Sequence, residues 1–206
     1  MHKNIQFLQK AETMSRFLLQ KGCDIIRKTV YKMKGNQRKM ANPVISIKIR
    51  NYGTMTAELY PQFAPATVKN FLKLIEDGFF TGLIFHRVIK GFMIQGGGYT
   101  PDFGHKEAPS IKGEFISNGF SANTLKHTRG VLSMARTSDP DSASSQFFIM
   151  HQDAPYLDGQ YAGFGKLTDG FDVLDAIAGC RTGNVGFYMQ DVPKDTVEIE
   201  SIQVIG

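Results

Sequence analysis

The chain has 206 residues, of which 42% are hydrophobic, which is enough for one well-buried core but short for two full domains. Its formal charge of +5 is unevenly distributed, because residues 1–40 hold ten Lys/Arg against two acidic residues, whereas residues 41–206 hold fourteen against seventeen. The larger part is therefore slightly acidic, which argues against a nucleic-acid-binding surface there. No apolar stretch approaches the roughly twenty residues that span a bilayer. Cys23 and Cys180 fit reduced thiols of a cytoplasmic protein better than a disulfide framework.

Residues 1–42 are predicted to form a basic amphipathic extension, because apolar residues recur at loosely helical spacing among ten basic ones. Our leading interpretation is that this segment is either peripheral to the fold or not native coding sequence, since Met40 stands directly before the first clear strand. Membrane contact through residues 1–40 and organelle targeting are the alternatives. A secretory signal is not favoured, because the apolar run at 17–19 is interrupted at once by Gln20 and Lys21.

Residues 43–206 are predicted to form a single domain that begins with a hairpin and a helix. Residues 44–49 alternate apolar and polar side chains from Ile45 on, and a turn at 51–53 leads to a second strand over 54–59. The helix is predicted over 64–77, because Pro65 suits a first turn and Gly78 can end the helix.

Short apolar runs separated by glycine-rich turns predict the remaining strands. They lie at 83–89, 92–95, 130–134, 146–150 and 163–167, with a final alternating strand over 196–205. A second helix is predicted over 169–177, and residues 183–186 are interpreted as a loop. Many short strands with two helices indicate a mainly β fold, in which the helices cap a closed barrel.

The run from Phe85 to Gly98 is the strongest functional signal, because Arg87 stands among closely spaced apolar residues. A guanidinium cannot lose its proton to escape burial, so it needs acceptors from the protein or from a ligand. This run, the sequence Ser-Gln-Phe-Phe-Ile at 145–149 and the sequence Tyr-Leu-Asp-Gly at 156–159 resemble the cyclophilin family of peptidyl-prolyl cis/trans isomerases. The resemblance covers about residues 43–206.

The resemblance implies a closed eight-stranded antiparallel β-barrel with a helix over each open end. It also implies an enzyme that accelerates rotation about X-Pro bonds during protein folding and needs no cofactor and no metal. Arg87 would be the catalytic residue, donating a hydrogen bond to the nitrogen of the twisted prolyl amide. The expected partners are proline-containing peptides and unfolded proteins, and the expected state is a cytoplasmic monomer.

The resemblance assigns substrate-binding roles to ten further residues. Gln95 would orient Arg87 and touch the substrate backbone, Gln146 would support the same groove, and the backbone at Ala135 and Arg136 would pair with an extended peptide. The proline ring would enter a pocket formed by Phe92, Met93, Phe148 and Leu157. Tyr156 and Tyr161 would form an aromatic wall. Taken singly, Phe92, Met93 and Phe148 would be interpreted as ordinary core, and the nearby polar residues of the motifs favour a site instead. Gln146 alone could equally bond to backbone.

Four positions depart from the common family pattern. Tyr156 replaces a tryptophan that helps to bind cyclosporin in the family, so we expect weak cyclosporin affinity with isomerase activity retained. Tyr161 replaces a histidine, which changes the hydrogen bonding of the wall. Arg136 and Thr137 replace an asparagine-alanine pair, so the preference for the residue before proline is expected to shift.

Other functions have less support. The five histidines lack the close paired spacing of a helical zinc site, and residues 96–98 do not lead into a phosphate-binding helix. Ser144 and Ser145 lack a nucleophile-elbow pattern. The main alternative is a non-catalytic proline-peptide binding module or chaperone that uses the same groove. A further alternative is that residues 1–40 tether the domain to a membrane or to a partner.

Overall fold

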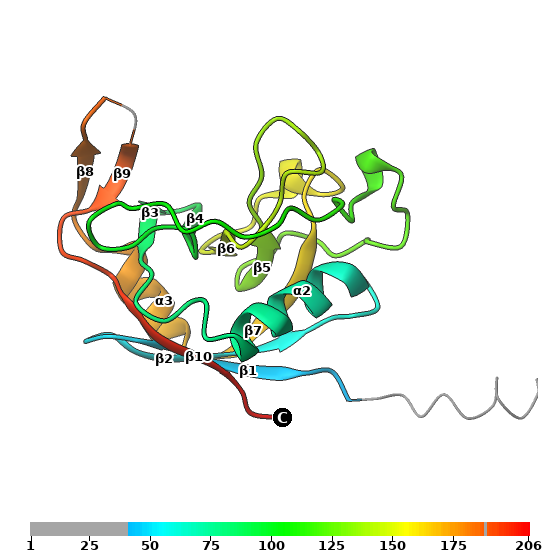
Figure 1. Ribbon diagram of the computed structural model, residues 1–206, viewed down its shortest axis with the longest axis horizontal. Helices are drawn as coiled ribbons and strands as arrows, with labels where there is room; N and C mark the ends of the chain where they lie inside the picture. The colour runs from blue at the N-terminus through cyan, green and yellow to red at the C-terminus, as the bar shows by residue number, and fades with distance from the viewer. Residues whose placement is uncertain (1–40, 188) are drawn as a thin grey trace, which may run out of the picture. The chain divides into compact units, whose positions relative to one another are not determined.

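The computed structural model describes residues 41–187 and 189–206, so the predictions made for residues 1–40 lie outside the described residues. In the described part, eight strands form one antiparallel sheet that curls around a hydrophobic interior (Figure 1). Their order across the sheet is β10-β1-β2-β7-β5-β6-β4-β3. The strands are β1 (Val44–Ile49), β2 (Gly53–Leu59), β3 (Phe85–Ile89), β4 (Met93–Gly96), β5 (Val131–Met134), β6 (Phe147–Met150), β7 (Gly163–Asp169) and β10 (Ile199–Val204).

The predicted mainly β fold with eight strands and two helices is confirmed, but the barrel is not fully closed, because the sheet is a curled half-barrel whose outer strands do not form a full ladder. The two edges approach each other at one isolated bridge between Ile84 and Glu198, beside which the N–H of Gly82 donates to the carbonyl of Ile199 at 2.9 Å and the N–H of Ile199 donates to the carbonyl of Leu83 at 2.8 Å. The backbone N–H of Phe85 donates to the carbonyl of Val197 at 2.9 Å beside it. These contacts are confined to residues 82–85 and 197–199, around the first residues of β3 and β10, and a separate hairpin also lies against β3 (Figure 1).

That hairpin consists of β8 (Thr182–Val185) and β9 (Met189–Pro193), and it was not predicted. Residues 183–186 were interpreted as a loop, but Gly183 pairs with Val192 and Val185 pairs with Met189. The reason for the error is physical. The hairpin is a two-stranded ribbon outside the main sheet, and the side chains of β8 are half-buried or exposed, so its sequence carries turn residues and no apolar alternation.

Both predicted helices are present, as α2 (Pro65–Glu76) and α3 (Phe171–Ala178). The buried face of α2 carries Phe71, whose ring centroid lies 4.9 Å from that of Phe80 and 5.0 Å from that of Phe164. These rings form part of the interior enclosed by the sheet. No helix among the described residues is long and apolar enough to cross a membrane.

The first turn of α2 is capped by a residue far away in the sequence. Ala64 at the N-cap provides no side-chain hydrogen bond. The buried carboxylate of Glu114 accepts instead, from the backbone N–H of Ala66 at 3.0 Å and from the N–H and hydroxyl of Thr67, both at 2.8 Å. A negative charge at this end is also favoured by the helix dipole. The loop that carries Glu114 is thereby fixed to the helix.

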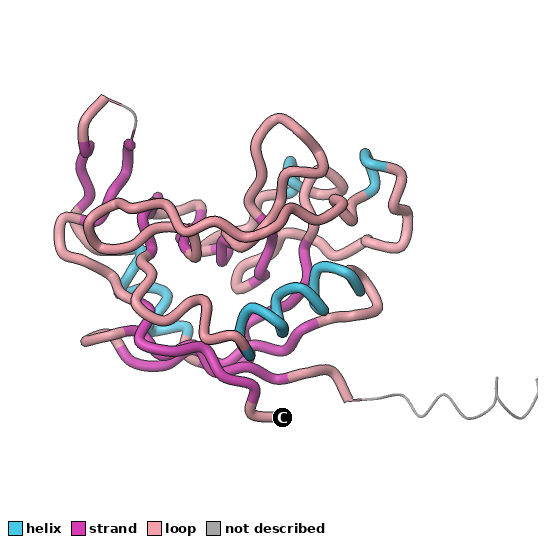
Figure 2. The backbone as a smooth tube through the Cα atoms, in the orientation of Figure 1, coloured by secondary structure: helices cyan, strands magenta, loops and turns pink. Residues whose placement is uncertain are grey.

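Two separate hydrophobic clusters lie on the two faces of β4 and β6. In β6, Phe147 and Ile149 belong to the interior of the half-barrel, whereas Phe148 and Met150 belong to a second cluster. This follows from the alternation of side chains along a strand. The second cluster also receives Leu157 from the short 3₁₀ helix η2 (Pro155–Leu157); another, η1 (Ile116–Asn118), lies in the mostly irregular segment between β4 and β5 (Figure 2).

Candidate active site

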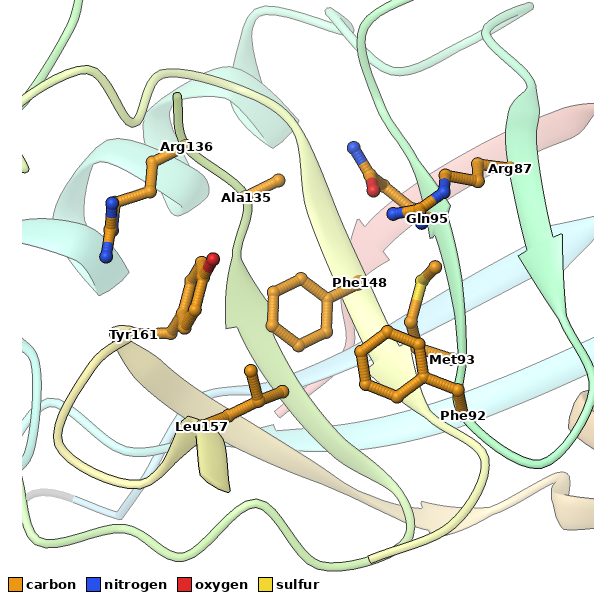
Figure 3. Close-up of a pocket in the computed structure, with 9 residues that line it drawn as sticks. All are labelled: Arg87, Phe92, Met93, Gln95, Ala135, Arg136, Phe148, Leu157 and Tyr161. Atoms are coloured by element: carbon orange, nitrogen blue, oxygen red, sulfur yellow. The ribbon is translucent and has the colours of Figure 1, made fainter. Parts of the chain in front are cut away.

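A pocket of about 340 Å³ opens over the second hydrophobic cluster (Figure 3). Nine of the eleven residues predicted for the site line it, while Gln146 and Tyr156 do not. In Figure 3, Arg87 and Gln95 lie on one side, Arg136 and Tyr161 on the other, and Phe148 between them. The lining residues are Arg87, Phe92, Met93, Gln95, Ala135, Arg136, Phe148, Leu157 and Tyr161.

The apolar wall of the pocket comes from three different elements. Met93 is on β4, Phe148 on β6 and Leu157 on η2, and all three side chains are buried. The ring of Tyr161 meets that of Phe148 edge-on, with 5.9 Å between centroids. The result is a concave apolar surface that fits a small ring.

Arg87 extends from β3 to the polar side of the pocket. Its side chain is 43% exposed, and its Nε lies 3.8 Å from Oδ2 of Asp191, which is an ion pair beyond hydrogen-bonding distance. The guanidinium forms no hydrogen bond with any of the residues that the structure describes. It is therefore not turned inward, and its donors face a surface pocket.

Gln95 lies directly opposite Arg87 in the pairing of β3 with β4. Its Nε2 donates to Oε1 of Gln146 at 3.1 Å, and within the described ranges it has no hydrogen bond to Arg87. Gly98 leaves room for this arrangement, because a Cβ there would collide with Gln146. Gln146 thus supports Gln95 and lines an adjoining pocket that also borders Arg87.

The groove edge at Ala135 and Arg136 is already partly bonded. The backbone N–H of Ala135 donates to the carbonyl of Gln146 at 2.9 Å, so a peptide paired here must use other backbone groups. The guanidinium of Arg136 stacks 4.6 Å from the ring of Tyr161 and donates to the carbonyl of Gln160 at 3.0 Å. Arg136 therefore holds Tyr161 in place at the pocket wall.

A buried histidine behind the pocket was not singled out from the sequence. His127 stacks on Phe148, its Nε2 lies 3.0 Å from Oγ of Ser133, and its Nδ1 lies 3.2 Å from Oδ1 of Asp158. Burial lowers the pKa of His127, and the hydrogen bond with Asp158 offsets only part of that effect. The neutral ring thus braces Phe148 from behind. One indirect sign of this histidine was present in the sequence, since its partner Asp158 belongs to the Tyr-Leu-Asp-Gly motif at 156–159.

The arrangement suits a short extended peptide with one apolar ring. The ring fits the apolar wall, and the polar groups on the facing side are placed for the backbone on either side of it. In the described ranges, no three His, Cys, Asp or Glu side chains are grouped so that they could hold a metal ion.

Comparison with known proteins identifies the family. The family model for "Cyclophilin type peptidyl-prolyl cis-trans isomerase/CLD" matches residues 44–204. The chain belongs to the cyclophilin family. A peptidyl-prolyl cis-trans isomerase of Acinetobacter baylyi is 45% identical over 171 residues, covering 80% of this chain and 87% of that protein. Peptidyl-prolyl cis-trans isomerase B of Escherichia coli is also 45% identical, covering 75% of this chain and 95% of that protein.

Solved cyclophilin structures share the fold. The crystal structure of a Cryptosporidium parvum cyclophilin superposes with a TM-score of 0.68 at 34% identity, covering 80% of this chain and 98% of that one. The same protein crystallised in the presence of the dipeptide Ala-Pro gives a TM-score of 0.67 at 35% identity, over 79% and 99% of the two chains.

In this cyclophilin the two tyrosines expected at the aromatic wall differ in placement. Tyr161 lines the pocket, where Arg136 packs against it. Tyr156 is 69% exposed, with its ring centroid 6.0 Å from that of Phe92 at the rim. The wall of the cyclophilin pocket is therefore formed by Tyr161, while Tyr156 extends it outward.

Proposed function

We propose that this cyclophilin accelerates X-Pro isomerisation during protein folding through a hydrogen bond from Arg87 to the prolyl nitrogen. The observation that carries this proposal is the guanidinium at the pocket, which has no hydrogen bond within the described residues and borders the apolar wall. Its donors are thus available to a substrate held there. Arg136, the other cation of the pocket, already donates to the carbonyls of Thr137 and Gln160.

The proposed role of Arg87 follows from the chemistry of the amide. Rotation about the bond is opposed by resonance, with a barrier of roughly 18–20 kcal/mol. In the twisted state the nitrogen becomes pyramidal and gains a free lone pair, so a donor aimed at it binds the twisted state better than the planar one. That difference is what lowers a barrier. The apolar wall helps as well, because the planar amide is the more polar form and loses more by leaving water.

The size of the effect can be bounded. A charge-assisted hydrogen bond contributes roughly 1.5–3 kcal/mol, and each tenfold in rate needs about 1.36 kcal/mol, so Arg87 would supply about one to two powers of ten. Holding the proline ring and removing water from the amide would supply the remainder.

The test compares wild type, Arg87→Ala and Arg87→Lys on a tetrapeptide with one X-Pro bond and on a protein whose refolding is limited by proline isomerisation. Arg87→Ala should lose about 10- to 100-fold in kcat/KM. Arg87→Lys should recover only part of that loss, because an ammonium lacks the planar fork of donors. Peptide affinity, titrated separately, should change much less.

The same experiment decides between an enzyme and a non-catalytic binding module. A pure binder needs only the apolar wall, so wild type and Arg87→Ala would bind peptide alike and neither would accelerate isomerisation. Equal acceleration by both proteins would instead refute the proposed role of Arg87 while leaving the isomerase activity in place.

Proline-containing segments of unfolded proteins are the proposed substrates, since cyclophilins bind proline-containing peptides. Cyclosporin is proposed to bind weakly. The tyrosine that replaces the family's tryptophan, Tyr156, has a smaller ring and is 69% exposed at the rim.

A further inference from the structure

The β8–β9 hairpin carries an irregularity beside Arg87. Its pairs, Gly183 with Val192 and Val185 with Met189, leave one residue on β8 opposite two on β9. The two residues on β9 are Gln190 and Asp191, so β9 has a β-bulge at this point. Bulges often lie next to active sites, where they redirect a side chain.

Asp191 adopts the left-handed backbone conformation within this bulge, with φ of +59°. Glycine adopts that conformation without steric cost, and aspartate and asparagine are the other residues that adopt it most readily. Residues in such sparsely populated conformations persist where the surrounding structure fixes them, and they are concentrated at active sites and ligand-binding sites. The left-handed conformation of Asp191 in this bulge sets the direction in which its carboxylate extends.

The carboxylate lies beside Arg87. Oδ2 of Asp191 is 3.8 Å from Nε of Arg87, and the two side chains are similarly exposed, at 41% and 43%. Two neighbours of Asp191 on β9, Met189 and Gln190, line the pocket that adjoins Arg87. The hairpin thus forms the outer boundary of the space in which this guanidinium can move.

No other described group holds Arg87. Gln95, which the resemblance to cyclophilins implied as its orienting partner, donates to Gln146 instead. An unrestrained arginine side chain has several rotatable bonds, and ordering it on the substrate costs conformational entropy. A carboxylate at the Nε edge restricts those rotations and leaves the two terminal nitrogens free to donate.

We propose that Asp191 is a positioning residue for Arg87, which it holds by its Nε edge so that the terminal nitrogens face the proline pocket. This inference rests on the proposed function of Arg87. The pair is partly exposed and separated by more than hydrogen-bonding distance, so the charge of Arg87 is screened rather than neutralised. The contribution of Asp191 is to orientation, and it should appear in kcat more than in KM.

The left-handed conformation of residue 191 suits two substitutions that should not disturb the backbone. Asp191→Asn and Asp191→Gly both remove the charge and both tolerate positive φ, so neither should unfold the hairpin. Asp195→Asn is the matched control, because Asp195 forms an ion pair of the same 3.8 Å length with Arg181 at an exposed site. Thermal melting of all three variants checks that the fold is retained.

We expect both Asp191 variants to lose about two- to fivefold in kcat with little change in KM, as an exposed pair of this kind allows. Asp195→Asn should match wild type. Added salt should lower the kcat of wild type toward that of the variants and leave the variants nearly unchanged. Wild-type kcat in both Asp191 variants would overturn the proposal, and so would an equal loss in Asp195→Asn.

A double-mutant cycle separates this proposal from the one on which it depends. In the Arg87→Ala background, Asp191→Asn should have no further effect on kcat, because Asp191 acts only through Arg87. The same loss in both backgrounds would refute the positioning role while the role of Arg87 stands. Full activity of Arg87→Ala itself would refute the role of Arg87.

Discussion

Replacing Glu114 with alanine should destabilise the domain more than an alanine substitution at any other position of the same loop. The carboxylate accepts three hydrogen bonds from Ala66 and Thr67 at the first turn of α2, and Glu114 is only 5% exposed. Leaving buried donors unsatisfied costs about 1–3 kcal/mol, and losing a negative charge at a helix N-terminus costs about 0.3–1 kcal/mol. We expect a loss of about 3 kcal/mol in the free energy of unfolding, which is about 6–12 °C in Tm for a domain of this size.

Urea denaturation and thermal melting measure this loss. Glu114→Gln should lose about half as much, because one amide oxygen can still accept both hydrogen bonds from Thr67. Glu107→Ala, in the same loop but exposed, is the control and should change stability by less than about 0.5 kcal/mol. If Glu114→Ala were as stable as that control, the distant carboxylate would not be the cap that the geometry indicates.

Two further predictions concern the surroundings of the pocket. Burial, with Arg87 and His105 adding to it, lowers the pKa of His86 from 6.5 to about 4, so the neutral ring stabilises the fold above pH 6.5 and that stability is lost as the pH falls toward 4. Between pH 7 and pH 4, the free energy of unfolding of His86→Phe should therefore fall by up to about 2–3 kcal/mol less than that of wild type, as measured by urea titration at each pH. Equal falls in the two proteins would contradict this prediction. Arg136→Lys should raise KM about two- to fivefold with kcat nearly unchanged, because an ammonium does not stack flat on Tyr161, and a wild-type KM would show that the stacking is dispensable.

Strands and helices with a clear period were predictable from the sequence. Ile45, Ile47 and Ile49 alternate with more exposed neighbours and are buried in the structure, as a half-buried strand requires. Pro65 lies in the first turn of α2, as predicted. Arg87 was singled out because a fixed charge stands among apolar side chains, whereas the apolar residues of the pocket were assigned through the resemblance to the cyclophilin family.

Features that depend on distant contacts were not predictable. In β6 all four residues are buried, because one face packs into the half-barrel and the other into the pocket cluster, so alternation gave no sign of two faces. The partner of Gln95 and the cap from Glu114 both depend on how loops return to the sheet. Asp191 was missed because its hairpin has no apolar period, and nothing local signals a bulge there.

The two hydrophobic clusters of β4 and β6 have a consequence for how this fold diversifies. Met93 and Phe148 contribute to the pocket from one face of the sheet, while Ile94 and Ile149 contribute to the interior from the other. Substitutions on the pocket face can thus reshape what the protein accepts while the packing that secures its folding stays intact. Substitutions at alternate positions of the same short strands can therefore change substrate selectivity almost independently of the stability of the fold.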